Sequence, residues 1–259
     1  RGEIRSKTPT EIEDEAKRLS ENGFCEIVLV GINLTSYGKD IGLSICDAVS
    51  AAAKPEGIKR VRLGSLEPDH ISDGTLDALY NEPKFCPQFH LALQSGCDKT
   101  LKRMNRHYDT EFYRGLVKKI RSRFENASIT TDIMVGFAGE TEEEFSESVA
   151  FLREIGFARS HVFAYSRRKG TVADGLKNQV EPDEKARRAA IMAEAAKECE
   201  EGFIKSQLGQ TSTVLFEIYK DGTNEGYTEN YTRVHISGED LSGKIVEIQL
   251  NEENLGISE

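Results

Sequence analysis

Residues that could bind a polar ligand follow or end five apolar, strand-like runs along the chain. These segments contain amide, hydroxyl, carboxylate, aromatic or glycine groups, and the candidates are Asn33, Tyr37, Ser65, Glu67, Gln94, Ser95, Asp132, Gly136, Phe163 and Tyr165. The carboxyl ends of parallel strands meet at one edge of a sheet, where loops assemble ligand sites. The pattern therefore predicts one binding site built from five strand ends.

Each candidate also has a simpler interpretation. Asp132 lies inside an apolar run, where an unpaired carboxylate costs several kcal/mol, but a backbone hydrogen bond would also satisfy it. Asn33 and Gln94 could be loop caps, and Glu67 before Pro68 could be a solvated turn. Five polar strand ends in the same register nevertheless favour a site over five independent coincidences.

The cysteines do not form a metal-binding pattern. They are Cys25, Cys46, Cys86, Cys97 and Cys199, and none has the short spacing at which one loop holds a zinc ion or an iron–sulfur cluster. Scattered thiols without a secretory signal are typical of a reducing cytoplasm. We therefore expect packing cysteines, a cytoplasmic protein and no metal ligand within this chain.

The five runs are predicted to be parallel β-strands that alternate with helices. The predicted strands are Glu26–Val30, Ile58–Leu63, Gln88–Leu93, Ile129–Val135 and Ser160–Tyr165. The predicted helices are Thr10–Asn22, Asp109–Phe124, Thr141–Ile155 and the Ala-rich stretch Glu181–Phe203. Alternation of this kind indicates right-handed βαβ units in an α/β fold.

The pattern changes after Gly209. Thr211–Tyr219, Tyr231–Ile236 and Lys244–Leu250 are predicted to be strands of a small antiparallel β-barrel, because glycine-containing turns separate them. We place the boundary near Ser206, which divides the chain into domains 1–205 and 206–259.

The charge balance limits the partners. The chain has 34 basic and 44 acidic residues, so 34 − 44 gives a net charge of −10. Residues 206–259 hold three of the basic and ten of the acidic residues, or −7. No stretch approaches the ~18 apolar residues of a membrane-spanning helix, so no membrane partner is expected.

Five segments together resemble the radical S-adenosylmethionine (SAM) methylthiotransferases. They are VGINLTSYGKD, RLGSLEP, LALQSGCDKTLKRMNRHY, TTDIMVGFAGETEEEF and HVFAYSRRKGT. The GINLTSYGKD and SLEP segments look most like the branch that modifies threonylcarbamoyladenosine beside the tRNA anticodon. The tail, with GYTENYTRVHISG and LSGKIVEIQL, resembles the family's RNA-binding TRAM domain.

The resemblance implies a partial parallel (β/α)6 radical SAM barrel, with its first unit missing, followed by the TRAM barrel. It implies SAM and, in a full-length enzyme, two 4Fe-4S clusters that need an electron donor. The family's CxxxCxxC loop would precede Arg1, so the cluster ligands would lie outside this chain. We therefore expect no catalytic residue or metal ligand here, and no activity from this chain alone.

The family layout also implies roles for the strand-end residues. Asn33 and Tyr37 correspond to a loop near the methionine end of SAM, and Ser65 and Glu67 to positions near the ribose. Gln94 and Ser95 lie beside the mouth of the barrel. Asp132 and Gly136 would lie under the methionyl–ribose part, with Phe163 and Tyr165 along the adenine edge.

The implied partner is a tRNA anticodon stem-loop. Basic residues provide most of the affinity for phosphates, yet the tail is acidic. We therefore expect phosphate contacts from Arg103, Arg106 and Arg167, and base stacking or hydrogen bonding from Tyr227, Tyr231 and Arg233. A solvated face explains the helix-spaced basic residues equally well, and the tyrosines could simply pack the small barrel.

Two other functions fit the same sequence. A related branch thiomethylates an aspartate of a ribosomal protein and also has a TRAM domain. A non-catalytic RNA-binding protein could retain the barrel after losing its cluster. A CxxxCxxC loop encoded before Arg1 would favour an enzyme over the binding protein.

Overall fold

The computed structural model describes residues 3–257, and the chain forms two compact units. Unit 1 comprises Arg1–His90, Ile120–Ser128 and Ile204–Glu259. Unit 2 comprises Leu91–Lys119 and Ile129–Phe203. Segments far apart in the sequence thus fold together within unit 1.

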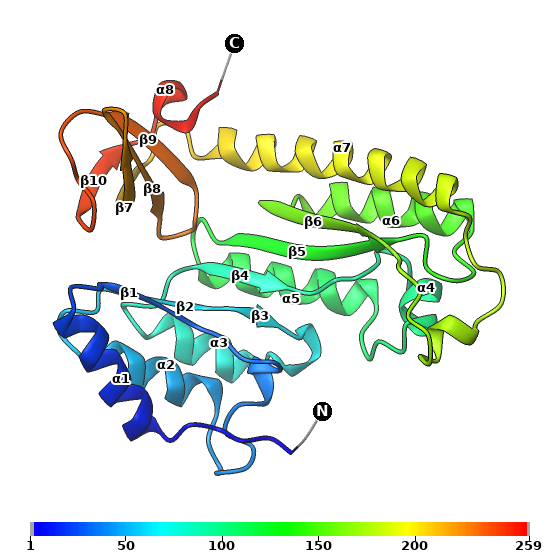
Figure 1. Ribbon diagram of the computed structural model, residues 1–259, viewed down its shortest axis with the longest axis horizontal. Coiled ribbons are helices and arrows are strands. Elements are labelled where there is room, and N and C mark those ends of the chain that lie inside the picture. The colour runs from blue at the N-terminus through cyan, green and yellow to red at the C-terminus, as the bar shows by residue number, and fades with distance from the viewer. Residues whose placement is uncertain (1–2, 258–259) are drawn as a thin grey trace. The chain divides into compact units, whose positions relative to one another are not determined.

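The first part of unit 1 has helices beside a parallel strand pair. α1 (Pro9–Glu21) begins at Thr8, whose hydroxyl accepts from the Glu11 amide while the Glu11 carboxylate accepts from the Thr8 amide. This reciprocal cap satisfies two backbone donors that the helix itself cannot pair. β1 (Glu26–Leu29) pairs in parallel with β2 (Arg60–Leu63), and α2 (Ile45–Ala53) lies beside α1 (Figure 1).

Short elements complete this part of unit 1. They are the 3-10 helices η1 (Leu34–Ser36) and η2 (Pro68–His70), strand β3 (Ser65–Leu66) and helix α3 (Asp73–Tyr80). β3 follows β2 after a single residue, so the SLEP segment lies where a strand passes into a loop.

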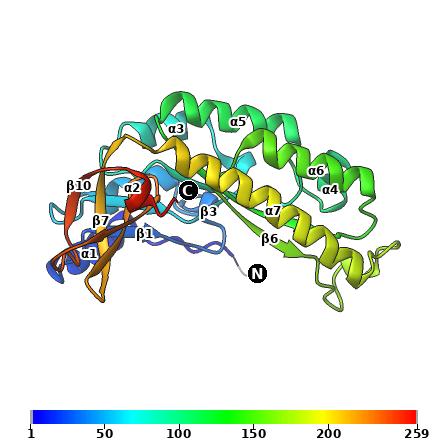
Figure 2. The same cartoon turned by 90° about the horizontal axis from the view of Figure 1, so that it is seen from above.

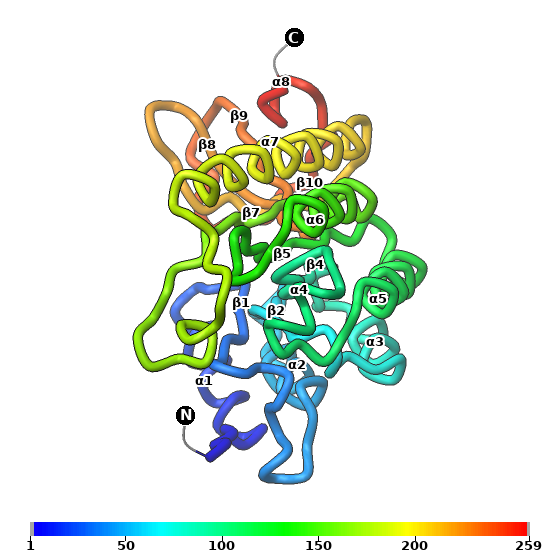
Figure 3. The backbone as a smooth tube through the Cα atoms, turned by 90° about the vertical axis from the view of Figure 1, so that its right-hand side faces the viewer, coloured from blue at the N-terminus to red at the C-terminus, as the bar shows by residue number. Residues whose placement is uncertain are grey.

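The end of the chain forms an antiparallel sheet in unit 1. Its strands are β7 (Thr211–Lys220), β8 (Thr223–Thr228), β9 (Arg233–Ser237) and β10 (Ile245–Gln249), in the order β10-β7-β8-β9. The short helical segment that follows β10 lies beside β9 (Figure 3). A core of Val214, Phe216, Val234 and Leu250 is completed by Leu255 of α8 (Glu252–Leu255). Residues 211–255 therefore form a small layer with its own apolar core.

Unit 2 contains a second pair of parallel strands and most of the residues of the three longest helices. β5 (Ser128–Val135) pairs with β6 (Arg159–Ala164), which places Asp132 opposite His161. α6 (Glu142–Ile155) begins with a Thr141 capping box and ends at Gly156 in the left-handed conformation. α7 (Pro182–Ser206) runs beside α6 (Figure 2). Unit 2 also contains α4 (Asp98–Arg103) and η3 (Ala173–Gly175), whereas β4 (Gln88–Leu91) and α5 (Thr110–Arg123) each have residues in both units.

The predicted α/β class is confirmed, with parallel strands and an antiparallel C-terminal sheet. All five predicted N-terminal strands are present with small changes at their ends. The tail has four strands where we predicted three, because β8 (Thr223–Thr228) lies in a polar, glycine-containing segment. No helix among residues 3–257 is long and apolar enough to cross a bilayer.

Candidate functional site

Six of the predicted cofactor residues lie near strand ends in unit 2. Asp132 and Phe163 lie on the same face of the β5–β6 pair, because residues opposite each other in the register point to the same side of a sheet. This face is the less buried one, and the Phe163 side chain is 47% exposed on it. On the other face, Ile133 and Val135 of β5 are fully buried.

The backbone of Gln94 pairs in parallel with Ile133 of β5. Its amide donates to Asp132 O at 2.9 Å, and its carbonyl accepts from the Met134 amide at 2.8 Å. Gln94 has a φ of 68°, a left-handed conformation that is uncommon outside glycine. Ser95 is completely buried, and its hydroxyl accepts from the Cys97 amide. The structure thus gives Gln94 a defined place beside β5 and Ser95 a local packing role.

Gly136 begins a tight turn after β5. It has a φ of 70°, and a Cβ atom there would lie 2.4 Å from Lys185 Cγ, so glycine is required for two reasons. The Gly136 amide donates to Glu140 Oε2 at 2.6 Å. Burial raises the pKa of Glu140, although Gly136 and Arg188 oppose this effect.

Tyr165 lies at the end of β6. Its ring packs edge to face on Phe137 at 5.0 Å, and Lys185 Nζ lies 5.1 Å from the ring centre. The Tyr165 hydroxyl is buried and has no hydrogen-bond partner among the described residues. A buried hydroxyl without a partner is unfavourable, so this group suits a polar atom of a ligand.

The unit 1 candidates lie in the loops that follow β1 and β2. Thr35 Oγ1 donates to Asn33 Oδ1 at 3.0 Å and lies 3.1 Å from His70 Nδ1. A single hydroxyl therefore joins the loop after β1 to η2. Ser65 is exposed on β3, and Glu67 is half-buried immediately before η2.

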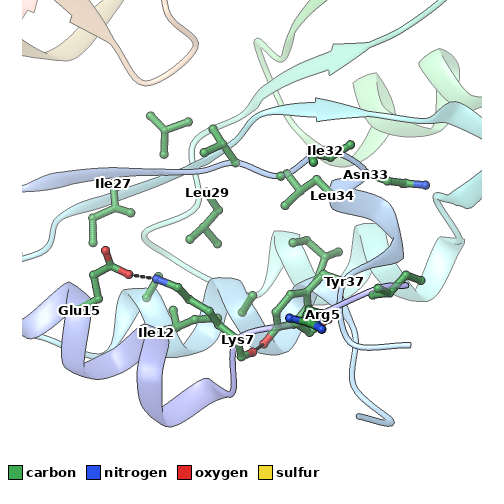
Figure 4. A pocket seen from close by; sticks show the side chains of 18 of the residues that line it. Arg5, Lys7, Ile12, Glu15, Ile27, Leu29, Ile32, Asn33, Leu34 and Tyr37 are labelled. Carbon is green, nitrogen blue, oxygen red and sulfur yellow. Dashed lines mark hydrogen bonds and ion pairs between the residues drawn. The ribbon is translucent and has the colours of Figure 1, made fainter. Parts of the chain in front are cut away.

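Tyr37 is directed toward the N-terminal segment. Its hydroxyl donates to Lys7 O at 2.7 Å, and burial raises its pKa. It lines a pocket of about 750 Å3 bounded by α1, α2 and β1 (Figure 4). The walls are mainly apolar, with Ile12, Ile27 and Leu34 among them, and Lys7 forms an ion pair with Glu15. Asn33 also lines this pocket.

Three of the basic residues predicted to bind RNA already have acidic partners. Arg103 forms a bidentate pair with Glu144, Arg167 binds Asp174 Oδ1 at 2.9 Å, and Arg233 pairs with Glu225. Arg106 is half-buried on the segment after α4. Because the carboxylates offset part of their charge, the paired arginines are weaker phosphate sites than isolated cations would be.

The two predicted stacking tyrosines contact each other. The Tyr227 and Tyr231 rings are stacked at 4.5 Å with an interplanar angle of 13°. The Arg62 guanidinium carbon lies 4.9 Å from the Tyr231 ring centre. Tyr231 has a φ of 66° and remains 44% exposed, so part of this ring is accessible to a ligand.

Two buried arginines of β2 were missed by the sequence analysis. Arg62 donates to Glu229 O, to Thr228 O and to the Glu26 carboxylate at 2.6, 2.9 and 2.8 Å. Arg60 donates to Tyr227 O at 2.9 Å and to Thr213 O at 2.6 Å. The signal was present in the run IKRVRL, where two arginines alternate within an apolar strand.

The fit to the implied cofactors differs between SAM and the clusters. The open face around Phe163, the unpartnered Tyr165 hydroxyl and the Gly136 turn suit a nucleoside with polar substituents. Within residues 3–257, no group of three or more His, Cys, Asp or Glu side chains could hold a metal ion. All five cysteines are free thiols. The described residues therefore fit SAM but do not supply the ligands of an iron–sulfur cluster.

Known structures share this fold. Coproporphyrinogen III oxidase (HemN) from Escherichia coli, described as a radical SAM enzyme, matches with a TM-score of 0.57 over 97% of this chain and 68% of its own. Methylornithine synthase (PylB) matches with a TM-score of 0.51 over 75% of this chain and 56% of its own. Sequence identities of 14% and 16% limit these likenesses to the fold.

Curated relatives are much closer in sequence. The chain is 37% identical over 260 residues to the tRNA-2-methylthio-N(6)-dimethylallyladenosine synthase of Clostridium botulinum (strain Loch Maree / Type A3), covering 98% of this chain and 58% of that protein. It is 36% identical over 261 residues to the threonylcarbamoyladenosine tRNA methylthiotransferase MtaB of Bacillus subtilis (strain 168), covering 96% and 57%. The chain thus spans little more than half the length of these relatives.

The family comparison agrees with the fold. The radical SAM superfamily matches residues 1–152, which include all but two of the predicted cofactor residues. The chain belongs to the radical SAM superfamily.

Proposed function

We propose that this chain is the radical SAM core and TRAM domain of a tRNA methylthiotransferase, with domains 1–205 and 206–259 and a partial (β/α)6 barrel in the first. The observation that carries the proposal is 36–37% identity to tRNA methylthiotransferases over 96–98% of the chain. The enzyme would insert a methylthio group at carbon 2 of a modified adenosine beside the anticodon.

SAM is the proposed cofactor at the strand ends. When bound, it supplies the radical chemistry and the methyl group of the reaction. Phe163 and the β5–β6 face would cover one side of the nucleoside, while Tyr165 Oη would hydrogen-bond to a polar atom. Asp132, Gly136 and Gln94 would line the same region of unit 2. For Asn33, Tyr37, Ser65 and Glu67, a role toward SAM is proposed from the family resemblance alone. Ser95 would act by supporting the loop, because its side chain is completely buried.

The clusters belong to the longer protein in this proposal. Two 4Fe-4S clusters and an electron donor would serve the full-length enzyme, with all ligands outside this chain. The scattered spacing of the five cysteines supports that division. Five free thiols also support a cytoplasmic location, because disulfides are rare there.

Each unit offers proposed RNA contacts of its own. Arg103, Arg106 and Arg167 would approach phosphates of the anticodon stem-loop, with neighbouring Lys99 and Lys102 exposed on α4. Tyr231 would offer the accessible part of its ring to a base, with Tyr227 stacked on it. Arg233 would add a hydrogen bond once it is released from Glu225.

Analysis of tRNA nucleosides tests the proposed substrate. We expect deletion of the gene to remove the 2-methylthio derivative of threonylcarbamoyladenosine and to leave the unmethylthiolated nucleoside in its place. The readout is mass spectrometry of digested tRNA, with complementation by the full-length gene as the control. Loss of the dimethylallyladenosine derivative instead would assign the other tRNA branch.

The two remaining functions give different results in the same strain. If all tRNA nucleosides are unchanged and a ribosomal-protein aspartate loses its methylthio group, the substrate is the protein. If neither changes, and no CxxxCxxC loop is encoded upstream, the non-catalytic RNA-binding function is favoured.

A further inference from the structure

A buried charge pair holds the turn that follows β5. Glu140 Oε2 accepts from the Gly136 amide at 2.6 Å and from Arg188 NH1 of α7 at 2.8 Å. The same Arg188 nitrogen donates to Glu140 O at 2.9 Å. The side chains of Glu140 and Arg188 are only 1% and 6% exposed, so water does not substitute for either partner.

The remaining nitrogens of Arg188 are also engaged. Nε donates to Glu184 Oε1 at 2.7 Å, and NH2 reaches Glu142 Oε2 at 3.4 Å. The planar guanidinium therefore has one orientation that satisfies all its groups. Arg188 connects the turn, the start of α6 and the first turns of α7.

Other contacts hold the same turn in the same conformation. The Gly139 amide donates to Asn178 O at 2.8 Å, and Phe137 packs on Tyr165. Lys185, one helical turn before Arg188, packs its Cγ where a side chain at Gly136 would lie. α7 thus covers the turn with two residues of one face, one packing against it and one bonded to it.

The Gly136 amide is occupied by its hydrogen bond to Glu140 Oε2. While this bond is intact, the amide is not available to an acceptor such as the carboxylate of SAM. The bond therefore fixes both the conformation of the turn and the direction of this donor.

We propose that Arg188 is a positioning residue for SAM. Through Glu140, it holds the turn at residues 136–140 in the conformation that binds the cofactor. This inference rests on the proposed function, because it assumes that SAM binds at the end of β5. A second ion pair between α6 and α7, Arg153 with Glu198, provides a contrast. Its side chains are 49% and 52% exposed, and they do not contact the turn.

The test compares three variants in the full-length, cluster-reconstituted protein: Arg188→Met, Arg188→Lys and the control Arg153→Met. Calorimetry measures the affinity for SAM, and thermal unfolding verifies folding. In parallel, hydrogen exchange in the 259-residue chain reports on residues 136–140. We expect Arg188→Met to weaken SAM binding at least tenfold and to speed exchange of the Gly136 amide at least tenfold. Arg188→Lys should restore part of both, and Arg153→Met should change neither.

Two results would overturn the inference. The first is a folded Arg188→Met protein with unchanged exchange in the turn and unchanged SAM affinity. The second is an equal effect of Arg153→Met, which would mean that only the packing of α6 on α7 matters. If Arg188→Met does not fold, Glu140→Gln replaces it, because the amide oxygen still accepts from Gly136 while the charge is lost. Faster exchange without any SAM binding by the wild type would instead reject the proposed function.

Discussion

Buried arginines occur in both units, but their partners differ. In unit 1, Arg62 donates to two backbone carbonyls and to one carboxylate. In unit 2, Arg188 contacts the carboxylates of three glutamates and one carbonyl. Carbonyl groups do not titrate, whereas carboxylates do.

The difference shows two uses of the same side chain. The bonds of Arg60 and Arg62 join residues 153–167 positions apart in the sequence, from β2 to the C-terminal sheet. They fix the position of a chain segment within unit 1. The bonds of Arg188 instead hold the conformation of one turn beside the candidate SAM site.

The largest effect on stability should come from Arg62→Met. This change leaves Glu26 and two carbonyls buried without their donor, and breaking a buried ion pair costs about 3–5 kcal/mol. Urea unfolding monitored by circular dichroism measures the loss. The matched control is Arg123→Met in the same unit, because Arg123 pairs with Asp77 at an exposed site. Equal losses for the two variants would contradict the importance of the buried network.

Arg60→Met should destabilise unit 1 less. The close partners of Arg60 are neutral, namely Tyr227 O, Thr213 O and the Thr213 hydroxyl, while Glu26 Oε2 is 3.6 Å away. Unsatisfied buried acceptors cost about 1–3 kcal/mol. The same urea experiment should therefore rank Arg60→Met between Arg62→Met and Arg123→Met. A loss larger than that of Arg62→Met would reverse our ranking of charged and neutral partners.

Two nearby carboxylates in unit 2 should respond to pH in opposite directions. Hydrogen bonds from Arg103 lower the pKa of Glu144, so its contribution to stability is present above the ordinary glutamate pKa and is lost as the pH falls through the lowered value. Burial raises the pKa of Glu140, so its contribution is present below the ordinary pKa and is lost as the pH rises through the raised value.

Stability measured from pH 3 to pH 8 tests both signs. The difference between wild type and Glu144→Gln should shrink as the solution becomes acidic. The difference between wild type and Glu140→Gln should shrink as the pH rises. Parallel curves for both variants would show that neither carboxylate changes its pKa on folding.

The smallest effects should appear in the salt dependence of RNA binding. Each phosphate contact adds about 0.7–0.9 to the slope of log affinity against log salt concentration. Replacing both Lys99 and Lys102 by alanine should flatten the slope for an anticodon stem-loop by about 1.4–1.8. Arg103→Ala should flatten it less, because Glu144 offsets the Arg103 charge. The opposite order would show that Arg103 leaves Glu144 when RNA binds.

The local pattern of residues determined most elements of this fold. Apolar runs predicted β1, β5 and β6, and the predicted helices Thr10–Asn22 and Thr141–Ile155 correspond to α1 and α6. These features depend on neighbours in the sequence, so they can be read without knowing the fold. The glycine after β5 was recognised as a site residue for the same reason.

Only the tertiary structure decided which charges are buried and what they bind. β8 was not predicted because its segment, TNEGYT, is polar. The side chain of Asn224 in this strand is nevertheless completely buried, donates to Glu239 O and accepts from the Leu241 amide. The sequence alone does not indicate that Arg60, Arg62 and Arg188 are buried, because segments distant in the sequence supply partners for each of them. The sequence by itself therefore determined the elements and the strand-end candidates, whereas pairing with buried polar groups, which depends on contacts between remote residues, was decided by the fold.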